Sequence, residues 1–209
     1  MPSMPGSLLL ATLIAVVTSA PAAGSSARTP GAVQATQVIT FLPAVPKGRR
    51  RSGDCWTESA AVDRPQAWRC AAGNEIYDPC FTVAGLKDAV VCGADPARRT
   101  AGFVLTLTKP LPARAASQVA EPLPWMLKLA DGSVCELTTG TAAQVDGQDV
   151  PYECSDSRRC DDDCPYLTGV TTNVSRATVW RADKVAFRST RGRVKLLKRT
   201  SLAVVAVWQ

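Results

Sequence analysis

Histidine is absent from this sequence of 209 residues, and its absence excludes most hydrolase mechanisms. Without imidazole there is no Ser-His-Asp triad, no Cys-His dyad and no histidine-ligated catalytic zinc. The nucleotide-binding patterns G-x-x-x-x-G-K-[ST] and G-x-G-x-x-G are also missing. The hydrolytic chemistry that remains is a carboxylate pair acting on a sugar bond. Its candidates, by residue type alone, are the glutamates Glu58, Glu75, Glu121, Glu136 and Glu153.

Long hydrophobic runs are scarce as well. The apolar run Leu8 to Val17 is followed by small residues through Ala23, which predicts a secretory signal peptide over residues 1–23. A transmembrane helix would need about 20 apolar residues, so we expect no membrane span in the mature protein. The expected location is secreted, either extracellular or associated with the cell envelope.

Residues 24–52 contain no cysteine but hold three prolines and the basic cluster Lys47, Arg49, Arg50 and Arg51. This composition is typical of a flexible leader, to which Val38 to Leu42 could add an edge strand. We interpret the basic cluster as a solvated linker. A processing site and an anchor for an anionic polymer are the two alternatives.

Eight cysteines follow this leader, and an even number in a secreted chain predicts disulfide bonds rather than buried free thiols. Pairing each cysteine with its neighbour gives the shortest loops. That pairing joins Cys55 to Cys70, Cys80 to Cys92, Cys135 to Cys154 and Cys160 to Cys164. Zinc held by Cys154, Cys160 and Cys164 would lack a fourth ligand, so we expect no metal there.

Turn signals and alternating hydrophobicity predict antiparallel hairpins. Asp131-Gly132 and Asp146-Gly147 both suit a two-residue type I′ turn. Trp125, Leu127 and Leu129 alternate with less apolar residues, as in a strand with one face on a core. The sequence therefore predicts one mainly β, disulfide-stabilised domain over residues 53–209, with long loops and at most short helices.

Strand patterns return near the C-terminus at Ala177 to Trp180, Lys184 to Arg188, Arg193 to Lys198 and Leu202 to Trp208. The whole segment from Val170 to Gln209 contains nine bases and a single acid, Asp183. A period of two puts Lys195 and Lys198 on opposite faces. Our hypothesis is a polyanion-binding face formed by Arg191, Arg193, Lys195, Lys198 and Arg199. An ordinary charged sheet surface and an intramolecular match to the preceding acidic loop are the alternatives.

That acidic loop includes Asp161, Asp162 and Asp163, which are weak calcium candidates. Calcium needs six to eight oxygen ligands, and the loop has no glycine of the EF-hand type. We therefore expect a solvated loop, and no cofactor is indicated.

Several cysteine-containing motifs resemble a known family. They are CWT at Cys55, AWRC ending at Cys70, GNEIYDPCF around Cys80, VVCG at Cys92 and LADGSVC ending at Cys135. Together they resemble a family of uncharacterised secreted cysteine-rich proteins of actinobacteria and similar bacteria. The resemblance implies an extracellular or envelope setting and brings no activity or catalytic residues. The pair Cys160 and Cys164 departs from this pattern.

The functional expectation is a secreted binding or interaction module, with an anionic envelope polymer or an extracellular protein as its partner. Aromatic residues near bridged loops and a cationic C-terminal segment provide recognition surfaces. The alternative is a histidine-free glycan hydrolase that uses two carboxylates. No nucleic-acid partner is indicated, and an enzyme is the less favoured interpretation.

Overall fold

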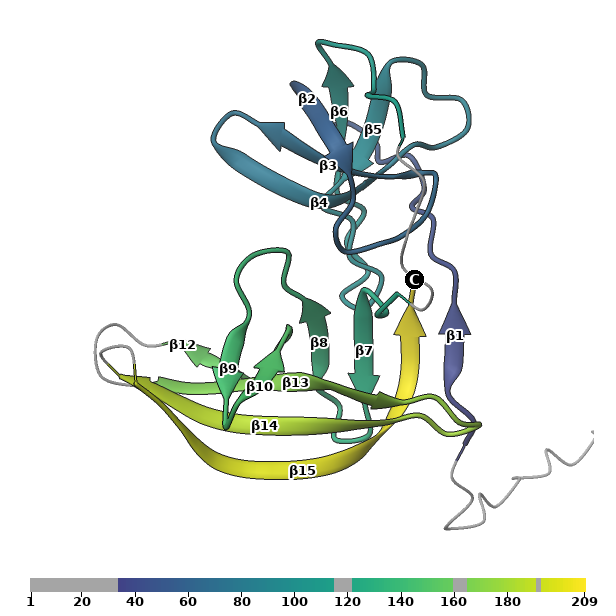
Figure 1. The fold of residues 1–209 in the computed structure, drawn as a ribbon. Coiled ribbons are helices and arrows are strands. Elements are labelled where there is room, and N and C mark those ends of the chain that lie inside the picture. Colours follow the sequence, from purple (N-terminus) through teal and green to yellow (C-terminus); the bar gives the residue numbers. More distant parts are fainter. Residues whose placement is uncertain (1–33, 115–121, 160–164, 191–192) are drawn as a thin grey trace, which may run out of the picture. The chain divides into compact units, whose positions relative to one another are not determined.

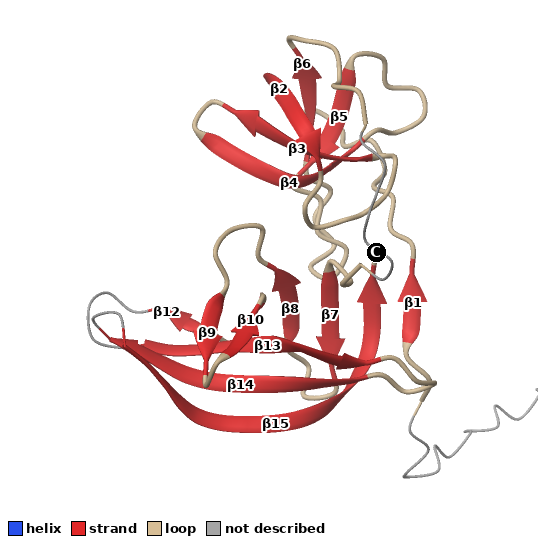
Figure 2. Ribbon diagram, viewed as in Figure 1, coloured by secondary structure: helices blue, strands red, loops and turns tan. Residues whose placement is uncertain are grey.

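The computed structural model describes residues 34–114, 122–159, 165–190 and 193–209. The chain from Val33 to Gln209 forms one compact unit. Every regular element in the described ranges is a β-strand (Figure 2). The mainly β, disulfide-stabilised fold predicted from the sequence is therefore confirmed.

Five strands form a closed barrel in the first half of the unit (Figure 1). They are β2 (Arg50–Glu58), β3 (Ala67–Ala72), β4 (Glu75–Phe81), β5 (Ala89–Cys92) and β6 (Phe103–Leu107). Successive strands are antiparallel, and a parallel pairing of β2 with β6 closes the ring. The interior buries Trp68, Phe103 and Leu105 together with four cysteines.

A second sheet contains eight strands of very different lengths. They are β1 (Gln37–Ile39), β7 (Met126–Leu129), β8 (Val134–Leu137), β11 (Tyr152–Cys154), β12 (Arg158–Arg159), β13 (Pro165–Ser175), β14 (Arg181–Thr190) and β15 (Arg193–Trp208). The order is β1-β15-β14-β13-β11-β8-β7, with β12 beside β13. Because β15 also pairs with β7, the path from β15 to β7 closes on itself. The long strands β13, β14 and β15 run side by side in Figure 1.

The two Asp-Gly signals have different outcomes. Asp146 and Gly147 have φ angles of 50° and 73°, as a type I′ turn requires, and they join β9 (Ala143–Val145) to β10 (Gln148–Val150). At the other signal only Gly132 has a positive φ, so the type I′ prediction is wrong there. The Asp131 carboxylate accepts hydrogen bonds from Ser133 N at 3.0 Å and Ser133 Oγ at 2.7 Å, which favours a longer loop.

Three disulfides join residues that are direct partners on adjacent antiparallel strands. They are Cys55–Cys70, Cys80–Cys92 and Cys135–Cys154, the partners that neighbour pairing predicts. Hairpin-like connections bring sequence neighbours into register, which is why the shortest loops are the ones closed. Cys160 and Cys164 lie outside the described residues.

The second half of the predicted flexible leader over residues 24–52 belongs to the fold, and β1 lies at a sheet edge close to the edge strand expected at Val38 to Leu42. β1 pairs in parallel with the C-terminal end of β15, and the first residues of β2 pair with β6. The Phe41 ring lies 5.8 Å from that of Phe81 and 5.9 Å from that of Trp125, between centroids. The compact unit thus begins before Gly53, because ladder hydrogen bonds and aromatic packing outweigh a proline-rich composition.

The C-terminal strand boundaries also differ from those predicted. Arg193 to Lys198 and Leu202 to Trp208 belong to one strand, β15, whereas Ala177 to Trp180 forms no strand. The long strand β13 was not predicted. Register shifts in both the β13–β14 and β14–β15 pairings interrupt the alternation on which the sequence prediction depends.

Candidate functional site

The structure brings two of the five candidate glutamates together. Glu136 on β8 and Glu153 on β11 are Cα partners in an antiparallel ladder. Glu58 pairs instead with Arg114 at 3.8 Å, and Glu75 binds Arg51. Glu121 lies outside the described residues. Partners on an antiparallel ladder project their side chains from the same face of the sheet, so the two carboxyl groups are neighbours.

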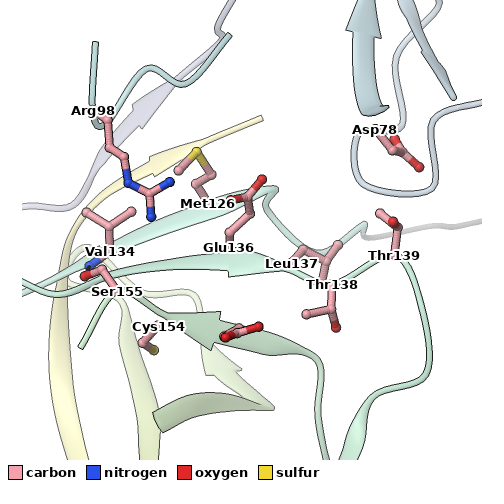
Figure 3. Close-up of a pocket in the computed structure, with 11 residues that line it drawn as sticks. Asp78, Arg98, Met126, Val134, Glu136, Leu137, Thr138, Thr139, Cys154 and Ser155 are labelled. Carbon is pink, nitrogen blue, oxygen red and sulfur yellow. Dashed lines mark hydrogen bonds between the residues drawn. The ribbon is translucent and has the colours of Figure 1, made fainter. Parts of the chain in front are cut away.

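Both glutamates line a pocket of about 450 Å³. Figure 3 shows the pocket, with Glu136 and Leu137 on β8 and with Asp78 and Arg98 contributed by other segments. The Arg98 guanidinium forms an ion pair with Asp95 at 3.1 Å. The pocket therefore combines several carboxylates with one arginine that already has an acidic partner.

Burial raises the pKa of two carboxyl groups that line this pocket, those of Glu136 and Asp78. It raises the pKa of Glu136, although the Trp125 Nε1–H donates a hydrogen bond to Glu136 Oε1 at 3.3 Å. Burial also raises the pKa of Asp78, against hydrogen bonds from Ser59 Oγ and the Ala60 N–H. The negative charge of Asp95, and after it that of Glu153, raises the pKa of Glu136 further, whereas the positive charge of Arg98 lowers it. A carboxyl group that keeps its proton to a higher pH is suited to act as a general acid.

The predicted polyanion-binding residues do not form one face. Arg191 lies outside the described residues, and for Arg193 the structure describes only the backbone, which pairs with Thr190. Lys198 pairs with Ala186 and Leu196 pairs with Phe187, which leaves Leu197 as the extra residue of a β-bulge.

This bulge changes which bases share a face. Lys195 and Lys198 project from the same face of the sheet, so the prediction that they face opposite ways is wrong. Arg199 projects from the other face, where its Nη1 donates a hydrogen bond to Gln148 Oε1. A bulge adds one residue and inverts the alternation beyond it, which a strict period of two cannot anticipate.

Two further residues extend the Lys195 face. Arg188, exposed, is the ladder partner of Lys195, so its side chain projects from the same face. Tyr166 on β13 is 42% exposed and lines a pocket of about 260 Å³ together with Lys198. We call Arg188, Lys195 and Lys198 the hairpin triad. Arg188 was not predicted as a site residue, although pairing the two C-terminal strands as a ladder would have placed it opposite Lys195.

A buried lysine, Lys184, lines the same pocket and was not predicted as a site residue. Lys184 is 9% exposed, and its Nζ donates hydrogen bonds to Asp131 Oδ2 at 2.8 Å, Ser133 Oγ at 3.0 Å and Asp156 Oδ2 at 2.7 Å. An ammonium group has three donors, so all are used. Burial tends to lower the pKa of Lys184, but these acceptors raise it overall. Lys184 therefore stays charged and connects three segments.

Three cysteines form a cluster of possible metal ligands among the described residues. Cys70, Cys80 and Cys92 lie close enough to hold a metal ion, but each is in a disulfide and offers no thiolate. The calcium candidates Asp161, Asp162 and Asp163 lie outside the described residues.

Three disulfides are typical of proteins that fold outside the reducing cytosol. Among the described residues, no helix has the length and apolar character needed to cross a membrane. Comparisons with protein-family models, with curated proteins and with solved structures gave no match.

Proposed function

We propose that this protein is a secreted binding module that holds an anionic polymer of the cell envelope on the hairpin triad of β14 and β15. The observation that carries the proposal is the bulge at Leu197, which places Lys195 and Lys198 on the face of Arg188. The apolar run near the N-terminus and the disulfides support the secreted setting.

The triad has no structural task that would explain it. All three side chains are exposed, and none has an ion pair with a described residue. Exposed charges of this kind contribute little to folding stability. Three adjacent cations do attract a polyanion, because binding releases the counterions that the polymer had condensed.

Tyr166 indicates which chemical groups the bound polymer contains. Its ring is exposed on a neighbouring strand and lines the same pocket as Lys198. An aromatic face packs against the apolar face of a sugar ring, while the cations meet phosphate or carboxylate groups. A polymer with both sugar and acidic groups would contact the whole surface.

The test is binding to a purified teichoic-type polymer at low and at high salt. The intact protein should bind at low salt and lose affinity steeply as salt rises. The variant Arg188→Gln, Lys195→Gln, Lys198→Gln should bind weakly with little salt dependence. A matched control, Lys87→Gln, Arg181→Gln, Arg199→Gln, removes the same charge elsewhere and should bind normally. Equal losses in both variants would contradict the proposal.

A second candidate function is glycan hydrolysis at Glu136 and Glu153. It is favoured by one observation: a carboxyl group with a raised pKa lies directly beside a second carboxyl group in a pocket. It ranks second because the two side chains come from neighbouring strands of one sheet, and not from opposite walls of a cleft. Release of reducing sugar from envelope glycans, abolished by Glu136→Gln and by Glu153→Gln, would raise it to first place.

A further inference from the structure

The connection between β1 and β2 carries the basic cluster of the N-terminal segment. Lys47, Gly48, Arg49, Arg50 and Arg51 are all exposed. Residues 40–49 form no regular strand. Endopeptidases of the trypsin class cleave after lysine or arginine, so by sequence alone four bonds in this cluster are candidates.

These four peptide bonds differ in the backbone hydrogen bonds of their residues. Arg49 O accepts a hydrogen bond from Val104 N at 2.9 Å, and Arg50 to Gly53 pair with Val104 to Leu107 of β6. Neither Lys47 nor Gly48 forms a backbone hydrogen bond with a described residue, and Gly48 has a φ of 90°. A protease must draw its substrate out in an extended form, which costs least where no ladder has to be broken.

We propose that the Lys47–Gly48 bond is a processing site for a trypsin-class endopeptidase, and that residues 34–47 remain docked afterwards as a non-covalent strand. The reaction is a hydrolysis. The C–N bond between the two residues breaks and water adds across it, leaving a carboxylate on Lys47 and an amine on Gly48. No oxidant, reductant or other co-reactant is needed.

The docked state is held by specific contacts. Thr36 N donates to Thr178 O at 3.0 Å, and Thr36 Oγ1 donates to Val204 O at 2.6 Å. Gln37 to Ile39 pair with Ala206 to Trp208, and Gln209 N donates to Ile39 O at 3.0 Å. The first cysteine of the chain is Cys55, so no disulfide ties residues 34–47 to the rest.

Phe41 adds apolar packing to these hydrogen bonds. Its ring contacts Phe81 and Trp125, and its N–H donates to Gln209 O at 3.1 Å. The cleaved segment is thus a ligand of the edge of β15. Its departure would expose that edge for pairing with another extended segment, which makes the docked strand exchangeable.

Limited trypsin digestion of the disulfide-intact protein tests the site. Intact-mass analysis should show cleavage after Lys47 before any cleavage after Arg49, Arg50 or Arg51. Lys47→Gln should slow the first cut in this connection at least tenfold. A first cut after Arg49, Arg50 or Arg51 with Lys47 still joined to Gly48 would overturn the assignment.

Size-exclusion chromatography of the cleaved protein tests the docking. The fragment ending at Lys47 should co-elute with the rest of the chain and separate only in denaturant. Phe41→Ala should release it, whereas Val38→Ala, at a side chain that is 49% exposed, should not. Separation of the wild-type fragment in native buffer would overturn the docking.

In protein isolated from its native host, denaturation should release a chain that begins at Gly48. A chain continuous through Lys47 and Gly48 would overturn the processing proposal.

Discussion

Glu136 and Glu153 are direct partners on the β8–β11 ladder, one rung from the partners Cys135 and Cys154. Like charges opposite each other on a ladder destabilise a sheet, and partial burial of Glu136 adds to the cost. The disulfide beside them fixes the register in which this pair occurs. The unfavourable pair is therefore maintained by the rest of the fold.

The first prediction concerns the stability of Glu136→Gln at two pH values. Because the pKa of Glu136 is raised by burial, the folded state keeps this proton to a higher pH than the unfolded chain does. Stability is consequently lost as the pH rises above the unfolded pKa of about 4.3. Glu136→Gln should unfold at a higher urea concentration than the wild type at pH 7, and the difference should shrink at pH 4.

Glu75→Gln is the matched control for that experiment. Hydrogen bonds from Tyr77 and Arg51 lower the pKa of Glu75, so its charged form is favoured in the folded state. Its replacement should give no gain in stability at pH 7. A gain from Glu75→Gln equal to that from Glu136→Gln would show that the change in net charge, and not the burial of Glu136, is responsible.

The second prediction concerns Lys184→Met. This change leaves the carboxylates of Asp131 and Asp156 facing each other without their shared cation. Both carboxylates are partly exposed, so we expect a loss of about 2 kcal/mol in the free energy of unfolding, below the range for fully buried pairs. Urea unfolding at pH 7 measures it. Lys195→Met, at an exposed position, should change stability by less than about 0.5 kcal/mol.

The same cluster gives a pH dependence with a defined sign. Burial opposes the charge of Asp131, but hydrogen bonds from Lys184 and Ser133 outweigh it and lower the pKa. The stabilisation from Asp131 is therefore present above the unfolded pKa and is lost as the pH falls through the folded value. The pKa of an aspartate in the unfolded chain is about 3.9. Between pH 5 and pH 3, Lys184→Met should therefore lose less stability than the wild type.

The third prediction concerns Gly53→Ala in the small barrel. A Cβ atom at Gly53 would lie 1.9 Å from Ala71 O, a backbone atom that cannot move aside without opening the β2–β3 pairing. We expect a loss of about 2 kcal/mol or more, seen as a lower melting temperature. Gly140→Ala provides the comparison, because nothing lies within 4 Å of its added Cβ. A similar loss from both would exclude the close approach as the cause.

Sequence features that involve only neighbouring residues determined much of the fold. Alternating hydrophobicity predicted the strand before Asp131, and Asp146-Gly147 determined its own turn through the φ angles that this pair tolerates. Cysteine pairing followed from short loops, because a hairpin puts neighbouring cysteines on the same rung. Each of these features depends on residues close together in the sequence.

The tertiary structure decided what depends on distant segments. Thr36 is held in the fold by a hydrogen bond to Val204. Lys184 is both charged and buried because its ammonium group donates hydrogen bonds to Asp131 and Asp156. The bulge at Leu197 exists in the pairing of two strands and not in either strand alone, yet it selects which bases share a face. Residue type and spacing identify the candidate site residues. The register between strands decides which of these residues become neighbours, and register depends on segments that are distant in the sequence.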